Sequence, residues 1–355
     1  MANMRVSRPG KPLRVGIVGA GLQARRRASV FHELRDATLV TIAAAHVERA
    51  KQLANKMGCK ATDDWKDVVE SEDIDAVLVC TPPNLHATIS IAAMEHGKHV
   101  LCEKPLARTI DEAKEMVSVA HRNGVKLKCG FNHRHHPATT KAKELFDKGV
   151  VGQLDYLRCR YGICGRPGYE NEWRANPEIV SGGHLMEQGI HGIDLFRWFA
   201  GDFSHAVGFT STRYWKIAPL EDNAFALFKT NQGRIASLHS SLTQWKNLFS
   251  FEVSGHDGYI RVSGLGGSYG TECIAVGRRA FSEPFREDVT EFRGEDTSWH
   301  EEFKEFVASI REDREPIGNG SDGLEALRLV FAVYQSAATG AAVNLDHSNT
   351  QNGLG

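Results

Sequence analysis

Residues 13–24 read Leu13-Arg-Val-Gly-Ile-Val-Gly19-Ala-Gly21-Leu-Gln-Ala24 and give the clearest indication of the fold class. A short apolar run is followed by the spacing Gly-x-Gly-x-x-Ala and then by residues that favour a helix. In such a turn the first glycine permits a tight bend and the second lets the backbone approach a pyrophosphate, while the small third residue lets helix and strand pack closely. Since a helix N-terminus attracts phosphate groups, the stretch predicts a dinucleotide-binding turn.

The alternation of strands and helices continues to about residue 131. Further strands are expected at 38–45, 75–80, 98–102 and 125–129, with helices at 47–57, 84–97 and 109–123. The run at 75–80 is apolar throughout, as in a parallel strand that is buried on both faces. This order predicts an α/β unit with a doubly wound parallel sheet, the Rossmann arrangement, over residues 12–135.

The pattern changes after about residue 150. Short strand-like runs lie close together, with glycine turns between them, at 156–163, 206–215, 223–229, 234–243, 249–254 and 259–262. This spacing is typical of antiparallel strands. Helices are expected at 183–199, 299–312 and 323–338. We therefore expect an α+β domain with a mainly antiparallel sheet over 136–345, and a polar tail at 346–355.

Composition narrows the class of protein. The 355 residues are 41% hydrophobic and 25% charged, which excludes a disordered chain, and the formal net charge of −1 gives no general attraction to nucleic acid or to an anionic membrane. No run of 18 apolar residues exists, and the first 12 residues lack the apolar core of a signal peptide. The seven cysteines form no Cys-x-x-Cys pair and are expected to be buried free thiols. We expect a cytoplasmic protein.

The sequence leaves the choice of cofactor open. An acidic residue at the end of the second strand usually binds the ribose 2′-hydroxyl of NAD, but that position falls at about Ala44. His46, Arg49 and the arginines at 25–27 offer positive charge for a 2′-phosphate, as in NADP. The alternative is that these arginines lie on a solvated helix face. We expect NAD or NADP without a preference between them.

Three loops follow the ends of the predicted parallel strands, where ligands bind in such sheets. They read Cys-Thr-Pro-Pro-Asn-Leu-His at 80–86, Cys-Glu-Lys-Pro at 102–105 and Gly-Phe-Asn-His-Arg at 130–134. Later segments read Ser-Gly-Gly-His-Leu-Met-Glu-Gln-Gly-Ile-His-Gly-Ile-Asp at 181–194 and Asp-Gly-Leu-Glu-Ala-Leu at 322–327. With the glycine turn, these motifs closely resemble the Gfo/Idh/MocA oxidoreductases over about residues 12–345.

The resemblance implies a Rossmann domain followed by a domain with a large open sheet, which often forms oligomer contacts. It also implies hydride transfer between NAD(P) and a hydroxyl-bearing carbon of a sugar, cyclic polyol or related molecule. We therefore expect a homodimer or homotetramer through the open sheet, and a helix at 323–338 that packs back toward the Rossmann domain. The expected cofactor-binding residues are Gly19, Gly21, Leu22, Gln23, Ala24, His46, Arg49, Thr81, Pro82, Asn84, His86, Glu103 and Lys104.

The resemblance also implies the catalytic residues. Lys104 matches the lysine that hydrogen-bonds the reacting oxygen, and an ammonium there stabilises a developing alkoxide. His191 matches a histidine suited to taking the hydroxyl proton. Glu187 stands one helical turn earlier, where the family usually has Asp, and is expected to bind or orient the substrate. The alternatives are a surface salt bridge between Lys104 and Glu103, and a histidine that only packs a helix.

Substrate contacts are expected from Arg134, which matches a family arginine, and from the loop before residue 181. Aromatic faces suit a sugar ring or a base, and arginines suit phosphates, which raises a nucleotide sugar as substrate. The alternative is packing within the loop. No metal is expected, because Cys129 and the histidines at 133, 135 and 136 fit no standard spacing. The expected substrate-binding residues are Lys104, Arg134, Arg166, Trp173, Arg174, His184, Glu187 and His191.

Four functions compete. The leading one is an NAD(P)-dependent dehydrogenase or reductase of a sugar, nucleotide sugar or sugar derivative. The second is a cyclic polyol dehydrogenase of the inositol type. A third is a dinucleotide-binding regulator without turnover, against which Lys104 and His191 argue. A fourth is a glycoside hydrolase that uses NAD as a transient oxidant, for which the chain is short.

Overall fold

The structure is a computed structural model that describes residues 11–345. Within this range the chain divides into two compact units. The first contains the residues up to His135, together with 178–181 and 297–327. The second contains 136–177, 182–296 and the described residues from 328 onward. A single boundary at 135/136 therefore takes no account of 297–327, which cluster with the first unit.

The first unit holds a sheet of six strands in the described chain, in the order β3-β2-β1-β4-β5-β6, and every pair is parallel. The predicted doubly wound parallel sheet is confirmed. The strands are β1 (Leu13–Val18), β2 (Ala37–Ala43), β3 (Lys60–Thr62), β4 (Ala76–Val79), β5 (His99–Cys102) and β6 (Leu127–Cys129). The strand β3 was not predicted, because its three residues have no apolar pattern and pair only at the sheet edge.

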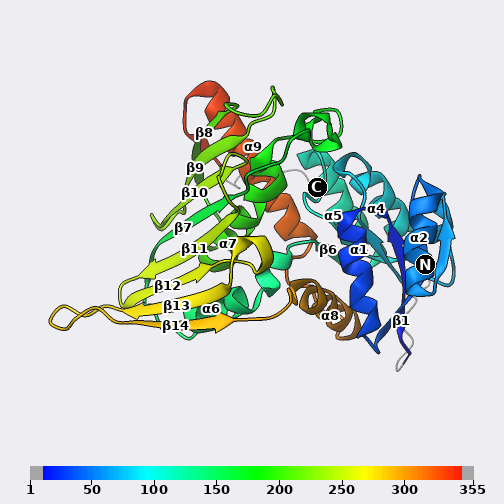
Figure 1. Cartoon of the computed structure of the whole chain (residues 1–355), viewed down its shortest axis with the longest axis horizontal. Coiled ribbons are helices and arrows are strands. Elements are labelled where there is room, and N and C mark those ends of the chain that lie inside the picture. Colours follow the sequence, from blue (N-terminus) through cyan, green and yellow to red (C-terminus); the bar gives the residue numbers. More distant parts are fainter. Residues whose placement is uncertain (1–10, 346–355) are drawn as a thin grey trace, which may run out of the picture. The chain divides into compact units, whose positions relative to one another are not determined.

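Helices connect these strands (Figure 1). The helix α5 begins with a capping box, in which Thr109 and Glu112 satisfy each other's backbone N–H groups. Its end at Gly124 lies in the left-handed region that glycine adopts readily. The helices and helical turns are α1 (Leu22–Ser29), η1 (Val30–His32), α2 (Val47–Met57), α3 (Lys66–Val69), η2 (Pro83–Leu85), α4 (His86–Glu95), α5 (Ile110–Asn123), η3 (Asn132–His135) and α8 (Ser298–Arg311).

The helix α8 belongs to the core of the first unit although it is distant in sequence. Its side chains Phe303, Phe306 and Ile310 join one hydrophobic cluster with residues of β1, β2, α1 and α2. Burial of three such side chains contributes about 5–9 kcal/mol before the entropy of ordering is subtracted. The sequence predicted this helix but did not indicate which of the two sheets it packs against.

The second unit holds a sheet of nine strands in the described residues, in the order β14-β13-β12-β11-β7-β10-β9-β8-β15. Only β7 and β10 pair in parallel, so the predicted mainly antiparallel sheet is confirmed. The strands are β7 (Leu154–Gly162), β8 (His205–Ser211), β9 (Asn223–Lys229), β10 (Ile235–Ser241), β11 (Leu248–Gly255), β12 (Gly258–Ser263), β13 (Glu272–Arg278), β14 (Glu287–Phe292) and β15 (Val343–Asn344). The sequence analysis missed β13, β14 and β15; β14 is acidic and largely exposed, and β15 has only two residues.

One face of this sheet is covered and the other is open. Residues of β9 alternate between buried and exposed, and α6, α7 and the later part of α9 pack on the buried face. The open face presents Phe209, Phe225, Leu227 and Ile235 to solvent. The helices and helical turns of this unit are α6 (Pro137–Asp147), η4 (Tyr169–Asn171), η5 (Trp173–Ala175), η6 (Leu185–Gly189), α7 (Ile190–Ala200), η7 (Gly267–Tyr269) and α9 (Gly320–Thr339).

The unit division falls within α9, whose residues up to Leu327 cluster with the first unit. None of the helices between residues 11 and 345 combines the length and the apolar composition needed to cross a membrane. All seven cysteines are free thiols, and those at 80, 102, 129 and 159 are buried, as the sequence predicted. The expectation of burial is wrong for Cys164, which is exposed, and Cys59 and Cys273 are partly exposed.

We expect His99 to make the protein less stable in weak acid. Burial and the nearby Lys126 ammonium lower the pKa of His99 to about 4, and its Nδ1 accepts the backbone N–H of Lys126 at 3.0 Å. The unfolded chain protonates near pH 6.5, so the stability is present above that pH and is lost as pH falls toward the folded pKa. Between about pH 7 and pH 5 the loss from this residue is roughly 2 kcal/mol.

Denaturant unfolding of wild type and His99→Asn at the two pH values measures this loss. The asparagine oxygen can still accept the Lys126 N–H but does not titrate. The decline in unfolding free energy between the two pH values should be smaller in the variant. An equal decline in both proteins would exclude His99 as its source.

Candidate active site

The glycine turn after β1 has the shape of a phosphate cradle. Gly19 adopts a φ of +115°, and a Cβ atom there would lie 2.5 Å from the carbonyl oxygen of Cys80. At Gly21 a Cβ would meet nothing within 4 Å, and this residue begins α1 without a side-chain cap. The side-chain oxygen of Gln23 is buried with no hydrogen-bond partner among the described residues. The open helix terminus fits the pyrophosphate of a bound dinucleotide, because its backbone N–H groups are free to donate to the phosphate oxygens.

The structure also places the remaining residues of the turn and those that follow the second strand. Ala24 is buried against the sheet, and Leu22 is half exposed. The strand β2 ends at Ala43, and His46 and Arg49 are exposed at the start of α2. These positions offer positive charge and no carboxylate at 44–46, so the geometry accommodates a ribose with or without a 2′-phosphate.

Two loops at the carboxyl edge of the same sheet contain further predicted cofactor residues. After β4, Thr81 and Pro82 are partly exposed and Asn84 is exposed. His86 is buried instead, with Nδ1 2.8 Å from the carbonyl oxygen of Pro105 and Nε2 2.8 Å from that of Thr81. Burial lowers the pKa of His86. This side chain therefore lies between two strand-end loops inside the unit and, when neutral, donates its one N–H to one of the two carbonyl oxygens.

The Glu-Lys-Pro motif directly follows β5. The Glu103 side chain points inward, and its Oε1 accepts a hydrogen bond from Arg27 Nε at 2.6 Å. Lys104 is partly exposed, and the peptide between Lys104 and Pro105 is cis. Glu103 thus supports the loop from within, while Lys104 stands at the edge of the sheet where ligands bind.

In the second unit, the segment that carries His184, Glu187 and His191 is not a regular α-helix. Residues Leu185–Gly189 form a π-helical turn before α7, whereas the sequence predicted one α-helix over 183–199. A Cβ at Gly189 would lie 2.8 Å from the Ser240 hydroxyl of β10, so only glycine permits this approach. Such turns are frequent at functional sites.

A buried carboxylate that the sequence analysis missed holds the start of this segment. Glu221 accepts the backbone N–H groups of Gly183 and Leu185, both at 2.8 Å, and the Tyr334 hydroxyl at 3.0 Å. Burial raises the pKa of Glu221. The residue lies in an irregular stretch outside any motif, so no sequence signal marked it.

His184 and His191 are both buried and flank one tyrosine. The Nδ1 atom of His184 lies 2.7 Å from the Ser240 hydroxyl. The ring centroid of Tyr161 lies 6.4 Å from that of His184 and 6.3 Å from that of His191. Burial raises the pKa of Tyr161 well above its ordinary value, so its hydroxyl stays protonated. The structure therefore brings the two predicted histidines together around Tyr161.

The carboxylate of Glu187 is held by the loop that precedes it. Its Oε2 accepts the Tyr169 hydroxyl at 2.9 Å, and its Oε1 accepts Arg174 Nε at 2.7 Å. Arg166 binds both oxygens of Glu172, with Nε 2.6 Å from Oε1. Both loop arginines expected to bind substrate are thus ion-paired within the unit.

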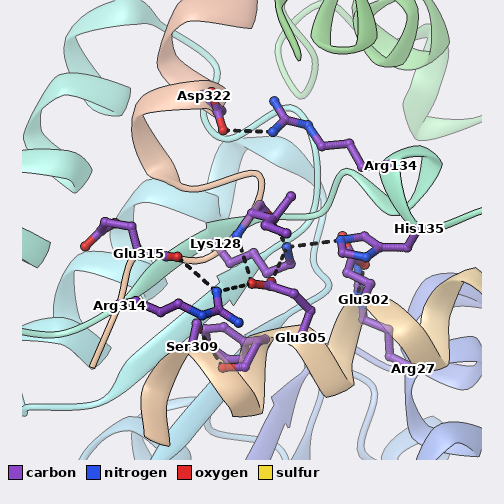
Figure 2. Close-up of polar contacts among 12 residues, drawn as sticks. Arg27, Lys128, Arg134, His135, Glu302, Glu305, Ser309, Arg314, Glu315 and Asp322 are labelled. Carbon is purple, nitrogen blue, oxygen red and sulfur yellow. Dashed lines mark hydrogen bonds and ion pairs between the residues drawn. The ribbon is translucent and has the colours of Figure 1, made fainter. Parts of the chain in front are cut away.

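Two other predicted substrate residues have partners close in sequence or within the same unit. The Arg174 guanidinium lies 4.3 Å from the ring centroid of Trp173. Arg134, in the first unit, pairs with Asp322 of α9 at 3.1 Å (Figure 2). Across residues 11–345, no group of three or more His, Cys, Asp or Glu residues is arranged to hold a metal ion.

Comparison with known proteins identifies a family. The model described as "Oxidoreductase family, NAD-binding Rossmann fold" matches residues 13–131, and its companion, the "Oxidoreductase family, C-terminal alpha/beta domain", matches 143–345. The chain is 25% identical to the uncharacterized oxidoreductase YrbE of Bacillus subtilis, covering 95% of this chain and 98% of the relative. It is 27% identical to the myo-inositol 2-dehydrogenase of Thermotoga maritima, with coverages of 94% and 99%.

A solved structure supports the same family assignment. A levoglucosan dehydrogenase in complex with NADH and levoglucosan superposes with a TM-score of 0.86 at 26% identity, covering 94% of this chain and 99% of that one. The resemblance stated from the sequence motifs is therefore confirmed.

Both carboxylate oxygens of Glu187 accept hydrogen bonds from the loop at 164–176. We therefore expect Glu187→Asp to make this loop more mobile. The shorter side chain cannot reach Tyr169 and Arg174 together. Limited digestion with trypsin should cleave the variant after Arg174 several-fold faster than wild type. The control is Glu115→Asp, which shortens the partner of Arg122 on the exposed face of α5. Equal cleavage rates in wild type and Glu187→Asp would show that Glu187 does not hold the loop.

Proposed function

The chain belongs to the Gfo/Idh/MocA family of oxidoreductases, and from this we propose that it transfers a hydride between NAD(P) and a ring hydroxyl carbon of a sugar or sugar derivative. The observation that carries the proposal is the position of Lys104. It follows β5 at the carboxyl edge of the same parallel sheet whose first strand ends in the glycine turn. In such sheets the ligand lies beyond that edge.

The reaction needs a hydride acceptor, a group that stabilises negative oxygen and a base. Bound NAD(P) supplies the nicotinamide ring that accepts the hydride. We assign the stabilising charge to Lys104, whose ammonium donates a hydrogen bond to the substrate oxygen. We assign the base to His191, which takes the hydroxyl proton as the C–H bond breaks and the carbonyl forms.

Three ion pairs favour an uncharged sugar or cyclic polyol over a nucleotide sugar. The diphosphate of a nucleotide sugar needs cations, and arginine is the residue best suited to bind it. Arg134, Arg166 and Arg174 are paired with Asp322, Glu172 and Glu187, respectively. Releasing any of these guanidinium groups would break an existing ion pair. A regulator without turnover would have no need for Lys104 and His191.

The direct test is cofactor reduction with a panel of compounds. The panel contains levoglucosan, myo-inositol, methyl α-D-glucoside and dTDP-glucose, each with NAD and with NADP. Reduction with an uncharged member supports the proposal. Reduction with dTDP-glucose alone would keep the oxidoreductase but reverse the choice of substrate. No reduction with any member would favour the regulator.

We further propose a cytoplasmic homodimer or homotetramer. The exposed apolar side chains of the open sheet face, Phe209, Phe225, Leu227 and Ile235, support an association through that face. The free cysteines support a reducing compartment.

Replacing Lys104 with Ala removes the charge that stabilises the alkoxide. We expect kcat to fall by about 10²–10⁴, while the Kd of the cofactor changes little. Steady-state kinetics and a cofactor titration measure the two quantities. The control is Lys114→Ala, which removes an exposed ammonium paired with Asp111 on α5. Wild-type turnover in Lys104→Ala would remove Lys104 from the mechanism.

If His191 is the base, oxidation should decline at low pH, because a protonated imidazole cannot accept the hydroxyl proton. His191→Asn should abolish that decline and reduce kcat far more than it weakens binding. Glu187→Gln should mainly raise KM, because the Glu187 carboxylate holds the loop at 164–176 and is assigned to substrate binding. An unchanged pH profile in His191→Asn together with a collapsed kcat in Glu187→Gln would make Glu187 the base.

The substitution Ala44→Asp should shift cofactor preference toward NAD. A carboxylate at this position accepts a hydrogen bond from a ribose 2′-hydroxyl and repels a 2′-phosphate. We expect the ratio of the two Kd values to move by roughly 1–3 kcal/mol in favour of NAD. Calorimetric titration with both cofactors measures the ratio, and no change would mean that residue 44 is not at the ribose.

A further inference from the structure

A buried arginine joins the helix of the glycine turn to the Glu-Lys-Pro motif. Arg27 lies on α1 and is only 2% exposed. Its Nε donates to Glu103 Oε1 at 2.6 Å, and its Nη1 donates to Glu302 Oε2 of α8 at 2.9 Å. The Trp299 ring centroid lies 5.0 Å from the guanidinium carbon. Burial acts against the charge, but the two carboxylates raise the pKa of Arg27, so the guanidinium stays protonated.

The cluster fixes the residue immediately before Lys104. The backbone N–H of Glu103 donates to the carbonyl oxygen of Val79 at 2.9 Å, and its side chain is held by Arg27. Gly130 makes room for this contact, because a Cβ there would lie 2.8 Å from Arg27 Nη2 and 3.2 Å from Glu103 Cα. Both the backbone and the side chain of Glu103 are therefore restrained.

The residue after Lys104 is held as well. The carbonyl oxygen of Pro105 lies 2.8 Å from His86 Nδ1, and the other ring nitrogen of His86 contacts the carbonyl oxygen of Thr81. Lys104 is thus the partly exposed residue between two buried ones, Glu103 and Pro105. Its direction at the strand end depends on the contacts of its neighbours.

We propose that Arg27 is a positioning residue for Lys104, acting through Glu103. The proposal rests on the role of Lys104 given under Proposed function. Arg27 lies on the helix that begins at the glycine turn, and it restrains the end of the strand that precedes Lys104. The glycine turn and the Lys104 loop are therefore connected through this one side chain.

A buried ion pair contributes more to the orientation of its groups than to stability. Desolvation of the charges offsets most of their attraction, so well-packed apolar residues at such positions are often as stable. The ion pair adds direction, because a guanidinium binds carboxylates along fixed N–H vectors. Arg27 uses two of these vectors for two different carboxylates, which leaves the Glu103 side chain a single orientation. A misplacement of about 1 Å in a catalytic group is enough to slow a reaction about a hundredfold.

The test compares Arg27→Lys in two backgrounds, wild type and Lys104→Ala, using NAD or NADP and the panel member that is oxidised fastest. Lysine keeps the charge but has one donor centre and cannot hold both carboxylates in the same way. In wild type, Arg27→Lys should reduce kcat by about tenfold to a hundredfold with little change in KM. In the Lys104→Ala background it should change kcat by less than about twofold, because the two residues act as one unit.

The matched control is Glu305→Gln. Glu305 lies one turn after Glu302 on α8, and its carboxylate contacts Lys128 at 3.1 Å and Arg314 at 2.7 Å, as Figure 2 shows. This variant perturbs a buried ion pair of the same helix without touching Glu103. We expect it to lower the Tm while kcat stays within about twofold of wild type.

Equal reductions of kcat by Arg27→Lys in both backgrounds would overturn the proposal, since a purely structural role predicts additivity. A lowered Tm with unchanged kcat would overturn it too. If Arg27→Lys does not fold, Glu103→Gln is compared in the same two backgrounds and must show the same non-additivity. Failure of Lys104→Ala to affect turnover, or no turnover with any panel member, marks failure of the proposed function instead.

Discussion

The Rossmann unit depends on the contact of one buried guanidinium with two carboxylates. Arg27 on α1 binds Glu103 at the end of β5 and Glu302 on α8, so a single charge joins three elements that are distant in sequence. Removing one partner of a buried pair typically costs about 3–5 kcal/mol, because the other charge stays buried without compensation. Burial raises the pKa of Glu302, whereas Arg27 and Lys128 act in the opposite direction. Both cations therefore favour the charged form of this carboxylate against the effect of burial.

The second unit uses carboxylates in a similar way. Glu221 accepts two backbone N–H groups at the start of the segment that carries the histidines, and Glu187 joins the π-helical turn to the loop before it. Glu187 stands where the resemblance of the sequence motifs to the family implies an Asp. The longer side chain reaches both Tyr169 and Arg174, which gives the departure from the family pattern a structural reason.

Much of the fold was predictable because it rests on local patterns. The apolar runs of β1 and β4, the glycine turn and the capping box at Thr109 each identify an element from neighbouring residues. The edge strands β3 and β14 lack such a pattern, since they are short or exposed. The motifs identified Lys104 and His191 as candidates, but not the groups that hold them. Arg27 was read as part of an exposed or phosphate-binding run, and its burial comes from α8, which lies about 275 residues away.

Direct hydride transfer from a sugar carbon to the nicotinamide is tested most directly with isotope. A substrate from the panel is labelled with deuterium on the carbon that bears the reacting hydroxyl, and the reduced cofactor is isolated and analysed by mass spectrometry and NMR. We predict that the reduced nicotinamide carries one deuterium at its ring carbon, and that Lys104→Ala slows its appearance without changing its position. Reduced cofactor without deuterium, or no reduced cofactor at all, would contradict hydride transfer from that carbon.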